Sequence, residues 1–267
     1  MSTSLTDSRA PAIVITGASA GIGRALACEF AKRGWRLGLA ARRLDALEAL
    51  RDELHSQPAS RATQIELLQL DVDDEDTVAP RLTTLFDALG SVEVVVVNAG
   101  INALSSVGRG ELDTERRILR TNLLGAIATV DAAAALFMPQ RRGHIVAIAS
   151  VAAKVAVPRQ AAYCASKAGL AQYMNSARIE LSRHGVTVGT LLPGFVVTDT
   201  TGSTGSLLID GAAATSLGIA TGASGVDADT FTGVSAQHKY IGAAQSVSTL
   251  NYGKGIGTGT IEIIDSL

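Results

Sequence analysis

The feature that most constrains this chain is an alternation, from Pro11 onward, of short β-branched runs with longer amphipathic stretches. This alternation is typical of repeated strand–helix–strand units, which build a parallel sheet with helices on both faces. The runs predicted to be strands are 12–16, 36–40, 65–70, 92–97, 144–149 and 187–192. Leucine and alanine at helical spacing predict helices over 22–33, 44–56, 74–89, 111–138 and 160–184. The predicted fold class is therefore α/β, a doubly wound parallel sheet in a single domain.

Composition excludes several classes of protein. With 267 residues, 47 % hydrophobic, 18 % charged and a net charge of −2, the chain has an ordinary globular balance and no basic surplus for nucleic acid. It starts without the basic and apolar run of a secretory signal, and no apolar stretch is expected to span a bilayer, so we expect a cytoplasmic protein without a membrane partner. Cys28 and Cys164 are too few for a disulfide framework, and no cluster with metal-ligand spacing occurs, so we expect no metal.

The first predicted strand runs directly into a glycine-rich turn, Thr16-Gly17-Ala18-Ser19-Ala20-Gly21-Ile22-Gly23, after which a helix begins. Glycines let the backbone approach a pyrophosphate closely, and the amides at a helix N-terminus favour its negative charge. The turn predicts a nucleotide site formed by Gly17, Ser19, Ala20, Gly21, Ile22 and Gly23. The alternative is a tight strand-to-helix connection without a ligand.

The residue that distinguishes NAD from NADP is expected about twenty residues beyond the glycines, where a carboxylate would hold the ribose 2′-hydroxyl of NAD. This chain has Arg42 and Arg43 there instead. A guanidinium can bind a 2′-phosphate through paired, charge-assisted hydrogen bonds, so these arginines favour NADP over NAD. The alternative is a solvated basic turn at the start of a helix.

Several motifs occur together in a fixed order: the glycine turn, Asp71-Val72, Asn98-Ala99-Gly100, Asn122, Ser150, Tyr163-Cys164-Ala165-Ser166-Lys167, and Pro193-Gly194 followed by Val196 and Thr198. At these positions the chain resembles the classical short-chain dehydrogenase/reductase family. The resemblance spans roughly Pro11 to Thr200 and implies a Rossmann-type fold that binds a nicotinamide dinucleotide.

The resemblance implies roles for particular residues. Tyr163 would exchange a proton with a carbonyl oxygen, Ser150 would hold that oxygen, Lys167 would bind the nicotinamide ribose, and Asn122 would hold a water that relays protons. The expected cofactor contacts include the glycine turn, Arg42, Arg43, Asp71, Val72, Asn98, Ala99, Gly100, Tyr163, Lys167, Pro193, Gly194, Val196 and Thr198.

Spacing along the predicted helix supports one of these roles. Tyr163 and Lys167 are four residues apart and share a helix face. A tyrosine with a pKa near 10 exchanges protons poorly at neutral pH, and lowering that pKa by ~3 units requires about 4 kcal/mol. One unit charge ~4 Å away supplies about that much at an effective dielectric of 20, so we expect the lysine ammonium to lower the tyrosine pKa.

The chain is predicted to have three parts. Residues 1–10 form a flexible N-terminus and 11–200 the NAD(P)-binding catalytic domain, whereas 201–267 are an atypical segment rich in Gly, Ser, Thr and Ala. Relatives usually carry a helical substrate lid after this point, and no such helix pattern is found. A last strand is predicted over 259–265.

The expected activity is hydride transfer between NADP(H) and a carbonyl or secondary alcohol. Apolar residues over 151–157 favour a hydrophobic ketone, aldehyde or alcohol. Small residues on the helix of Tyr163 permit close approach of a partner helix, so we expect a homodimer or homotetramer. Two alternatives stay open: an NADP-binding protein whose altered C-terminal segment impairs turnover, and a scaffold or chimera in which that segment serves interaction.

Overall fold

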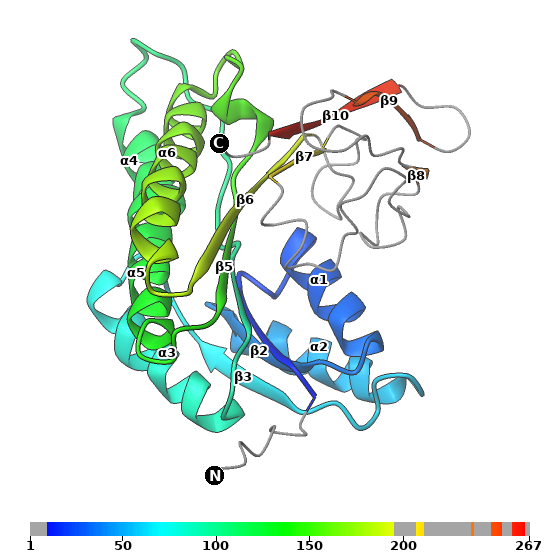
Figure 1. The fold of residues 1–267 in the computed structure, drawn as a ribbon. Coiled ribbons are helices and arrows are strands. Elements are labelled where there is room, and N and C mark those ends of the chain that lie inside the picture. Colours follow the sequence, from blue (N-terminus) through cyan, green and yellow to red (C-terminus); the bar gives the residue numbers. More distant parts are fainter. Residues whose placement is uncertain (1–9, 195–206, 211–235, 238–246, 253–257, 265–267) are drawn as a thin grey trace.

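The computed structural model describes residues 10–194, 207–210, 236–237, 247–252 and 258–264. At its centre lies a parallel sheet in the order β3-β2-β1-β4-β5-β6 (Figure 1). Its strands are β1 (Ala12–Thr16), β2 (Arg36–Ala41), β3 (Ile65–Gln69), β4 (Val94–Val97), β5 (His144–Ile148) and β6 (Thr187–Pro193). The strand order reverses between β1 and β4, and ligands bind beyond the carboxyl ends of the strands at such a point. The predicted doubly wound α/β fold is confirmed.

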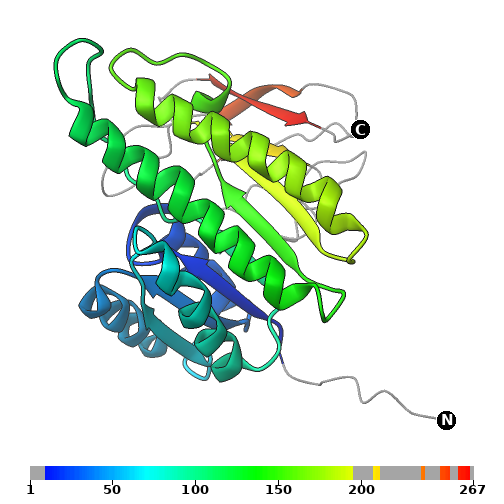
Figure 2. The same ribbon diagram turned by 90° about the vertical axis from the view of Figure 1, so that its left-hand side faces the viewer.

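Helices cover both faces of the sheet, with α1 and α2 on one face and α3, α5 and α6 on the other (Figure 1). Their bounds are α1 (Gly21–Lys32), α2 (Leu44–Ser56), α3 (Glu75–Leu89), α4 (Leu112–Leu119), α5 (Gly125–Phe137) and α6 (Ala161–Ser182). A π-helical segment, η1 (Arg120–Leu124), joins α4 to α5 where the sequence predicted one helix. Figure 2 shows α6 lying beside this joined run. A single 3₁₀ turn, η2 (Val151–Ala153), follows β5.

The apolar core forms two layers, one on each side of the sheet. Alternate residues of a strand face opposite sides, so Ile13 and Ile15 of β1 pack in the layer of α1 and α2, where Phe30 also lies. Val14 belongs to the other layer, together with Phe137 of α5. Each large side chain fully buried in this way stabilises the fold by about 1.5–3 kcal/mol.

A buried charge stabilises the end of the sheet opposite the carboxyl ends of its parallel strands. The guanidinium of Arg36, at the start of β2, donates to the carbonyl oxygens of Ala10 (2.7 Å), Ser91 (3.0 Å) and Leu89, and to the hydroxyl of Ser91. These acceptors replace the water that a buried cation loses. Arg36 thereby ties the start of β1 to the turn between α3 and β4.

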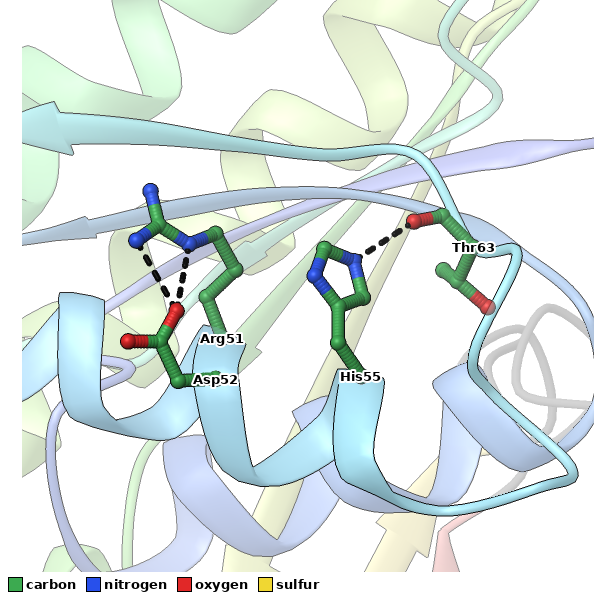
Figure 3. A network of polar contacts seen from close by, with 4 residues as sticks. All are labelled: Arg51, Asp52, His55 and Thr63. Atoms are coloured by element: carbon green, nitrogen blue, oxygen red, sulfur yellow. Dashed lines mark hydrogen bonds and ion pairs between the residues drawn. The ribbon is translucent and has the colours of Figure 1, made fainter.

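One histidine has a structural role that is visible in the bond it makes. His55, in the last turn of α2, makes a 3.0 Å hydrogen bond from its ring Nε2 to the carbonyl oxygen of Thr63 (Figure 3). This bond ties the end of the helix to the chain entering β3. Among the described residues, no group of three or more His, Cys, Asp or Glu side chains is placed to hold a metal ion.

One helical run is more apolar than the sequence analysis expected. Leu112–Phe137 is long and apolar enough to cross a membrane by length and composition, with a mean hydropathy of 1.2 over its best window. The expectation that no stretch would pass this test was wrong. In the fold, 56 % of that window is buried inside the protein, and α5 packs against α3, β4 and β5. It is therefore a core helix here.

Beyond β6, the described segments add four strands to the sheet: β7 (Leu207–Asp210), β8 (Ala236–Gln237), β9 (Val247–Tyr252) and β10 (Thr258–Ile264). β7 pairs antiparallel with β6, and β10 pairs parallel with β7. β10 occupies the stretch in which a strand was predicted, although residue 265 lies outside the described residues. The sequence pattern did not predict β7, β8 or β9, because none of them shows a long alternation of polar and apolar residues.

Candidate active site

The glycine turn between β1 and α1 is closed by contacts of the backbone itself. Gly17 has a φ of +68° and Gly21 a φ of +56°, a region that residues with a Cβ rarely adopt. A Cβ on Gly17 would lie 2.8 Å from the Cα of Ala99, and one on Gly23 would lie 2.5 Å from the carbonyl oxygen of Gly17. The three glycines are therefore required by the geometry of the turn.

The turn is fastened to β4 by Thr16 and Asn98. The Thr16 hydroxyl accepts hydrogen bonds from the backbone nitrogens of Asn98 (3.0 Å) and Ala99 (3.2 Å) and donates to the carbonyl of Val96. In return, the Asn98 side chain donates to the carbonyls of Thr16 (2.9 Å) and Gly17 (3.3 Å). The sequence analysis named Asn98 and Ala99 but missed the role of Thr16, whose only signal is a hydroxyl at the end of a buried strand.

The N-terminus of α1 is free to receive a negative charge. Its N-cap, Ala20, makes no side-chain capping bond, and its first turn has no acidic residue. The positive end of the helix dipole and the backbone amides of the first turn therefore face the glycine turn, and no capping side chain or carboxylate neutralises them. Nearby, the Arg43 guanidinium donates a 3.3 Å hydrogen bond to the Ser19 hydroxyl. This cradle of glycines, free amides and guanidinium groups suits the phosphates of a dinucleotide.

A cavity of about 610 Å³ connects this turn with β5 and α6. Of the predicted site residues, those that line it are Gly17, Ser19, Ala20, Gly21, Ile22, Arg42, Arg43, Asp71, Val72, Asn98, Ala99, Gly100, Ser150, Tyr163, Lys167, Pro193 and Gly194. Gly23 and Asn122 do not line the cavity, but each contacts residues that do. Val196 and Thr198 lie outside the described residues.

At the far end of the cavity, three polar side chains converge from two elements. Ser150 follows β5 and caps η2, its hydroxyl accepting a 3.1 Å hydrogen bond from the backbone of Ala152. Tyr163 and Lys167 lie one turn apart on α6, and the Lys167 Nζ is 5.9 Å from the centroid of the tyrosine ring. Ser150 also hydrogen-bonds Tyr163. The predicted meeting of these three residues in one site is observed.

Burial sets the ionisation of both groups on α6. It raises the pKa of Tyr163, while the hydrogen bond with Ser150 acts in the opposite direction and the neighbouring Cys164 raises it further. Burial also lowers the pKa of Lys167 to about 8, and its Nζ donates a 2.8 Å bond to the carbonyl of Ile148. The expected lowering of the tyrosine pKa by the lysine ammonium is not seen in the protein alone, where burial raises that pKa and Lys167 is not among the groups that shift it.

Asn122 shapes the site through the backbone. It lies fully buried in η1, where its side chain accepts a 2.7 Å hydrogen bond from the nitrogen of Ile101 and donates a 2.8 Å bond to the same residue's carbonyl. A Cβ on Gly100 would lie 3.2 Å from the Asn122 Oδ1 and 3.5 Å from the Lys167 Nζ. Asn122 therefore holds the chain after β4 beside the lysine. Widened π-turns of this kind are frequent at functional sites.

The buried ammonium of Lys167 gives a stability prediction. Its pKa falls from 10.5 to about 8 on folding, so the unfolded chain binds more protons between these values. At pH 7 the burial cost is fully present and amounts to roughly 3 kcal/mol, and it disappears as the pH rises from 8 through 10.5. Lys167→Met also loses the bond to Ile148, worth about 1 kcal/mol. We expect the variant to be about 2 kcal/mol more stable at pH 7.

Urea unfolding at pH 7 and pH 10 measures this effect, and the gain should shrink at the higher pH. The exposed Lys154, replaced by methionine, is the matched control and should show no such dependence on pH. A Lys167→Met protein that is no more stable than the wild type at pH 7 would contradict the assigned burial cost.

Comparison with known proteins agrees with this geometry. Residues 11–207 match the model of the family described as short chain dehydrogenase. An uncharacterized oxidoreductase of Myxococcus xanthus is 38 % identical over 188 residues, which are 70 % of this chain and 73 % of the relative. An alcohol dehydrogenase from the archaeon Thermococcus sibiricus, solved in complex with 5-hydroxy-NADP, has a TM-score of 0.65 and 28 % identity over 70 % of this chain and 77 % of its own. An NAD⁺-bound xylitol dehydrogenase has a TM-score of 0.66 and 26 % identity over 70 % of this chain and 71 % of its own.

Proposed function

The chain belongs to the short-chain dehydrogenase family of oxidoreductases, and from this premise we propose that it transfers a hydride between NADP(H) and a carbonyl or secondary alcohol. The observation that carries the proposal is the continuity of one cavity. It runs from the glycine turn and Arg43 at one end to Ser150, Tyr163 and Lys167 at the other. Its volume of about 610 Å³ suits a small-molecule site.

In the proposed mechanism, the substrate oxygen lies between the hydroxyls of Ser150 and Tyr163. Ser150 donates a hydrogen bond that orients the oxygen, and Tyr163 gives it a proton during reduction or takes one during oxidation. The two hydroxyls are already joined by a hydrogen bond, so a substrate oxygen can replace that contact with each of them. Lys167 supplies a positive charge beside the tyrosine ring.

The bound dinucleotide supplies the hydride donor or acceptor at its nicotinamide ring and, when oxidised, a positive charge that favours the tyrosinate. The protein alone raises the pKa of Tyr163 through burial. The lysine can also bind a sugar hydroxyl, because it lines the cavity and its ammonium has further hydrogens besides the one donated to Ile148. A water bound near Asn122 would pass the proton to solvent.

Arg42 and Arg43 support the preference for NADP. Both are exposed and line the cavity at the end of β2, and the Arg43 guanidinium reaches the glycine turn through Ser19. A 2′-phosphate bound there would gain charge-assisted hydrogen bonds that a 2′-hydroxyl does not. The similar solved structures include one with NAD⁺ and one with an NADP derivative, so the proposed cofactor preference depends on Arg42 and Arg43.

The double variant Arg42→Ala/Arg43→Ala is expected to weaken binding of NADPH at least tenfold and to change binding of NADH less than twofold. Thermal stability measured during titration with each cofactor reports this, because a ligand that binds only the native state raises the melting temperature. Arg51→Ala, on α2 away from the cavity, is the control. Equal losses for both cofactors would rule out the proposed selector.

The substrate end of the cavity supports an apolar ketone, aldehyde or alcohol. Val151, Ala152, Val155 and Val157 line it close to Tyr163. A panel of apolar carbonyl compounds, followed by oxidation of NADPH, tests the reaction. Binding of NADPH without turnover of any of them would favour a nucleotide-binding protein that is not an enzyme.

We also propose that the protein is a homodimer or homotetramer in which α6 meets its counterpart. The outer face of this helix carries the small residues Ala161 and Ala165, and Ile179 is 74 % exposed. Small residues let helices approach closely, and an exposed isoleucine gains from being covered. The mass measured by sedimentation equilibrium tests the assembly.

A further inference from the structure

A single buried hydroxyl in the cavity has no partner within the protein. The Thr121 side chain is 4 % exposed, and its Oγ1 makes no hydrogen bond. Among the described residues, the other buried side-chain atoms of this kind belong to Asp73 and Ser105, and neither of these residues lines the cavity. An unsatisfied buried hydroxyl costs about 1–3 kcal/mol, so its presence in a ligand cavity calls for a partner that the ligand brings.

The helix geometry explains why Thr121 has no internal partner. Threonines inside helices commonly bond the carbonyl one turn earlier, as Thr129 does to Gly125 at 2.7 Å, and as Thr83 and Thr84 do in α3. Thr121 lies in the π-helical segment η1, where the turn is wider. Its buried hydroxyl is thus left without a protein partner in a residue that lines the cavity.

The position of Thr121 identifies which part of a ligand it would meet. Gly125, one turn further along the same helical run, is packed so closely on the segment after β3 that a Cβ there would lie 2.6 Å from the carbonyl oxygen of Val72. Thr121 shares that face of the helix and lines the cavity together with Leu70, Asp71 and Val72. These residues follow β3, which is separated by the three strands β2, β1 and β4 from β5 and its Ser150.

We propose that Thr121 is a specificity residue for the adenine end of the dinucleotide, with its Oγ1 hydrogen-bonded to the edge of the base. A hydroxyl both donates and accepts, and the edge of adenine offers ring nitrogens as acceptors and an amino group as a donor. The proposal rests on the dinucleotide-binding function proposed above. It adds a polar contact from η1, separate from Asp71, which the sequence analysis named among the expected cofactor contacts.

The test compares Thr121→Val, which removes the hydroxyl while keeping the shape, with Thr129→Val as a matched control on the same helical run. Calorimetry with NADPH, with 2′,5′-ADP and with reduced nicotinamide mononucleotide separates the two ends of the cofactor. For Thr121→Val we expect the dissociation constants of NADPH and 2′,5′-ADP to rise about fivefold to tenfold and that of the mononucleotide to stay unchanged. Thr121→Ser should retain most of the affinity.

The melting temperature without cofactor gives a second readout. Thr121→Val should melt at a higher temperature than the wild type, because an unsatisfied buried hydroxyl has been removed, whereas Thr129→Val should melt lower, because its bond to Gly125 is lost. A Thr121→Val protein that binds 2′,5′-ADP within twofold of the wild type, or melts lower without cofactor, overturns the proposal. Failure of the wild type to bind NADPH overturns the proposed function itself.

Discussion

Replacing Tyr163 by phenylalanine is expected to lower turnover by about three orders of magnitude while leaving the affinity for NADPH within about twofold of the wild type. The phenylalanine ring keeps the packing of the tyrosine ring, including its contact with Lys167. It lacks the hydroxyl that hydrogen-bonds Ser150 and is proposed to carry the proton. Positioned proton transfer contributes about 10²- to 10⁴-fold to such reactions.

The dependence on pH separates this role from a structural one. Burial raises the pKa of Tyr163, so oxidation of an alcohol, which needs the deprotonated form, should accelerate as the pH rises toward that pKa. The residual rate of Tyr163→Phe should lose this dependence. Tyr173→Phe is the matched control, because Tyr173 lies on the same helix, has a pKa raised by burial and does not line the cavity. More than a tenth of the wild-type turnover in Tyr163→Phe would remove the assigned role.

Gly23→Ala is expected to destabilise the fold by about 2–3 kcal/mol and to abolish cofactor binding at concentrations that saturate the wild type. The new Cβ would lie 2.5 Å from the carbonyl oxygen of Gly17 and 2.5 Å from the Nδ2 of Asn98. The first of these is backbone and cannot move without opening the turn. Alanine is favoured over glycine inside a helix by about 1 kcal/mol, but overpacking commonly costs 1–3 kcal/mol and the displaced bonds of Asn98 add to it.

The control for this variant is Gly169→Ala, the same substitution inside α6. There the added Cβ meets only the side chain of Leu123, at 3.2 Å, which can shift by a few tenths of an ångström. We expect the free energy of unfolding of that variant to lie within about 1 kcal/mol of the wild-type value. Urea unfolding of both proteins measures the difference, and a Gly23→Ala protein as stable as the wild type would show that the turn is looser than its contacts indicate.

Local patterns in the sequence determined the layout of the first 194 residues. Two-residue and 3.6-residue periodicities identify strands and helices because they depend on neighbours in the chain. The observed bounds of these elements differ from the predicted ones by at most two residues, apart from the interruption of one predicted helix by η1. The four-residue spacing of Tyr163 and Lys167 places both on one face of α6 for the same reason. Strands β7 to β9 carry no such pattern and were missed.

Tertiary structure alone decided how the site residues are charged and bonded. The raised pKa of Tyr163 comes from burial, and the nearby lysine that the sequence shows is not among the groups that shift it. The clamp made by Thr16 and the free hydroxyl of Thr121 likewise depend on residues more than eighty positions away and on one widened helical turn. Desolvation and hydrogen-bond satisfaction are properties of the packed interior, and spacing along a chain does not contain them.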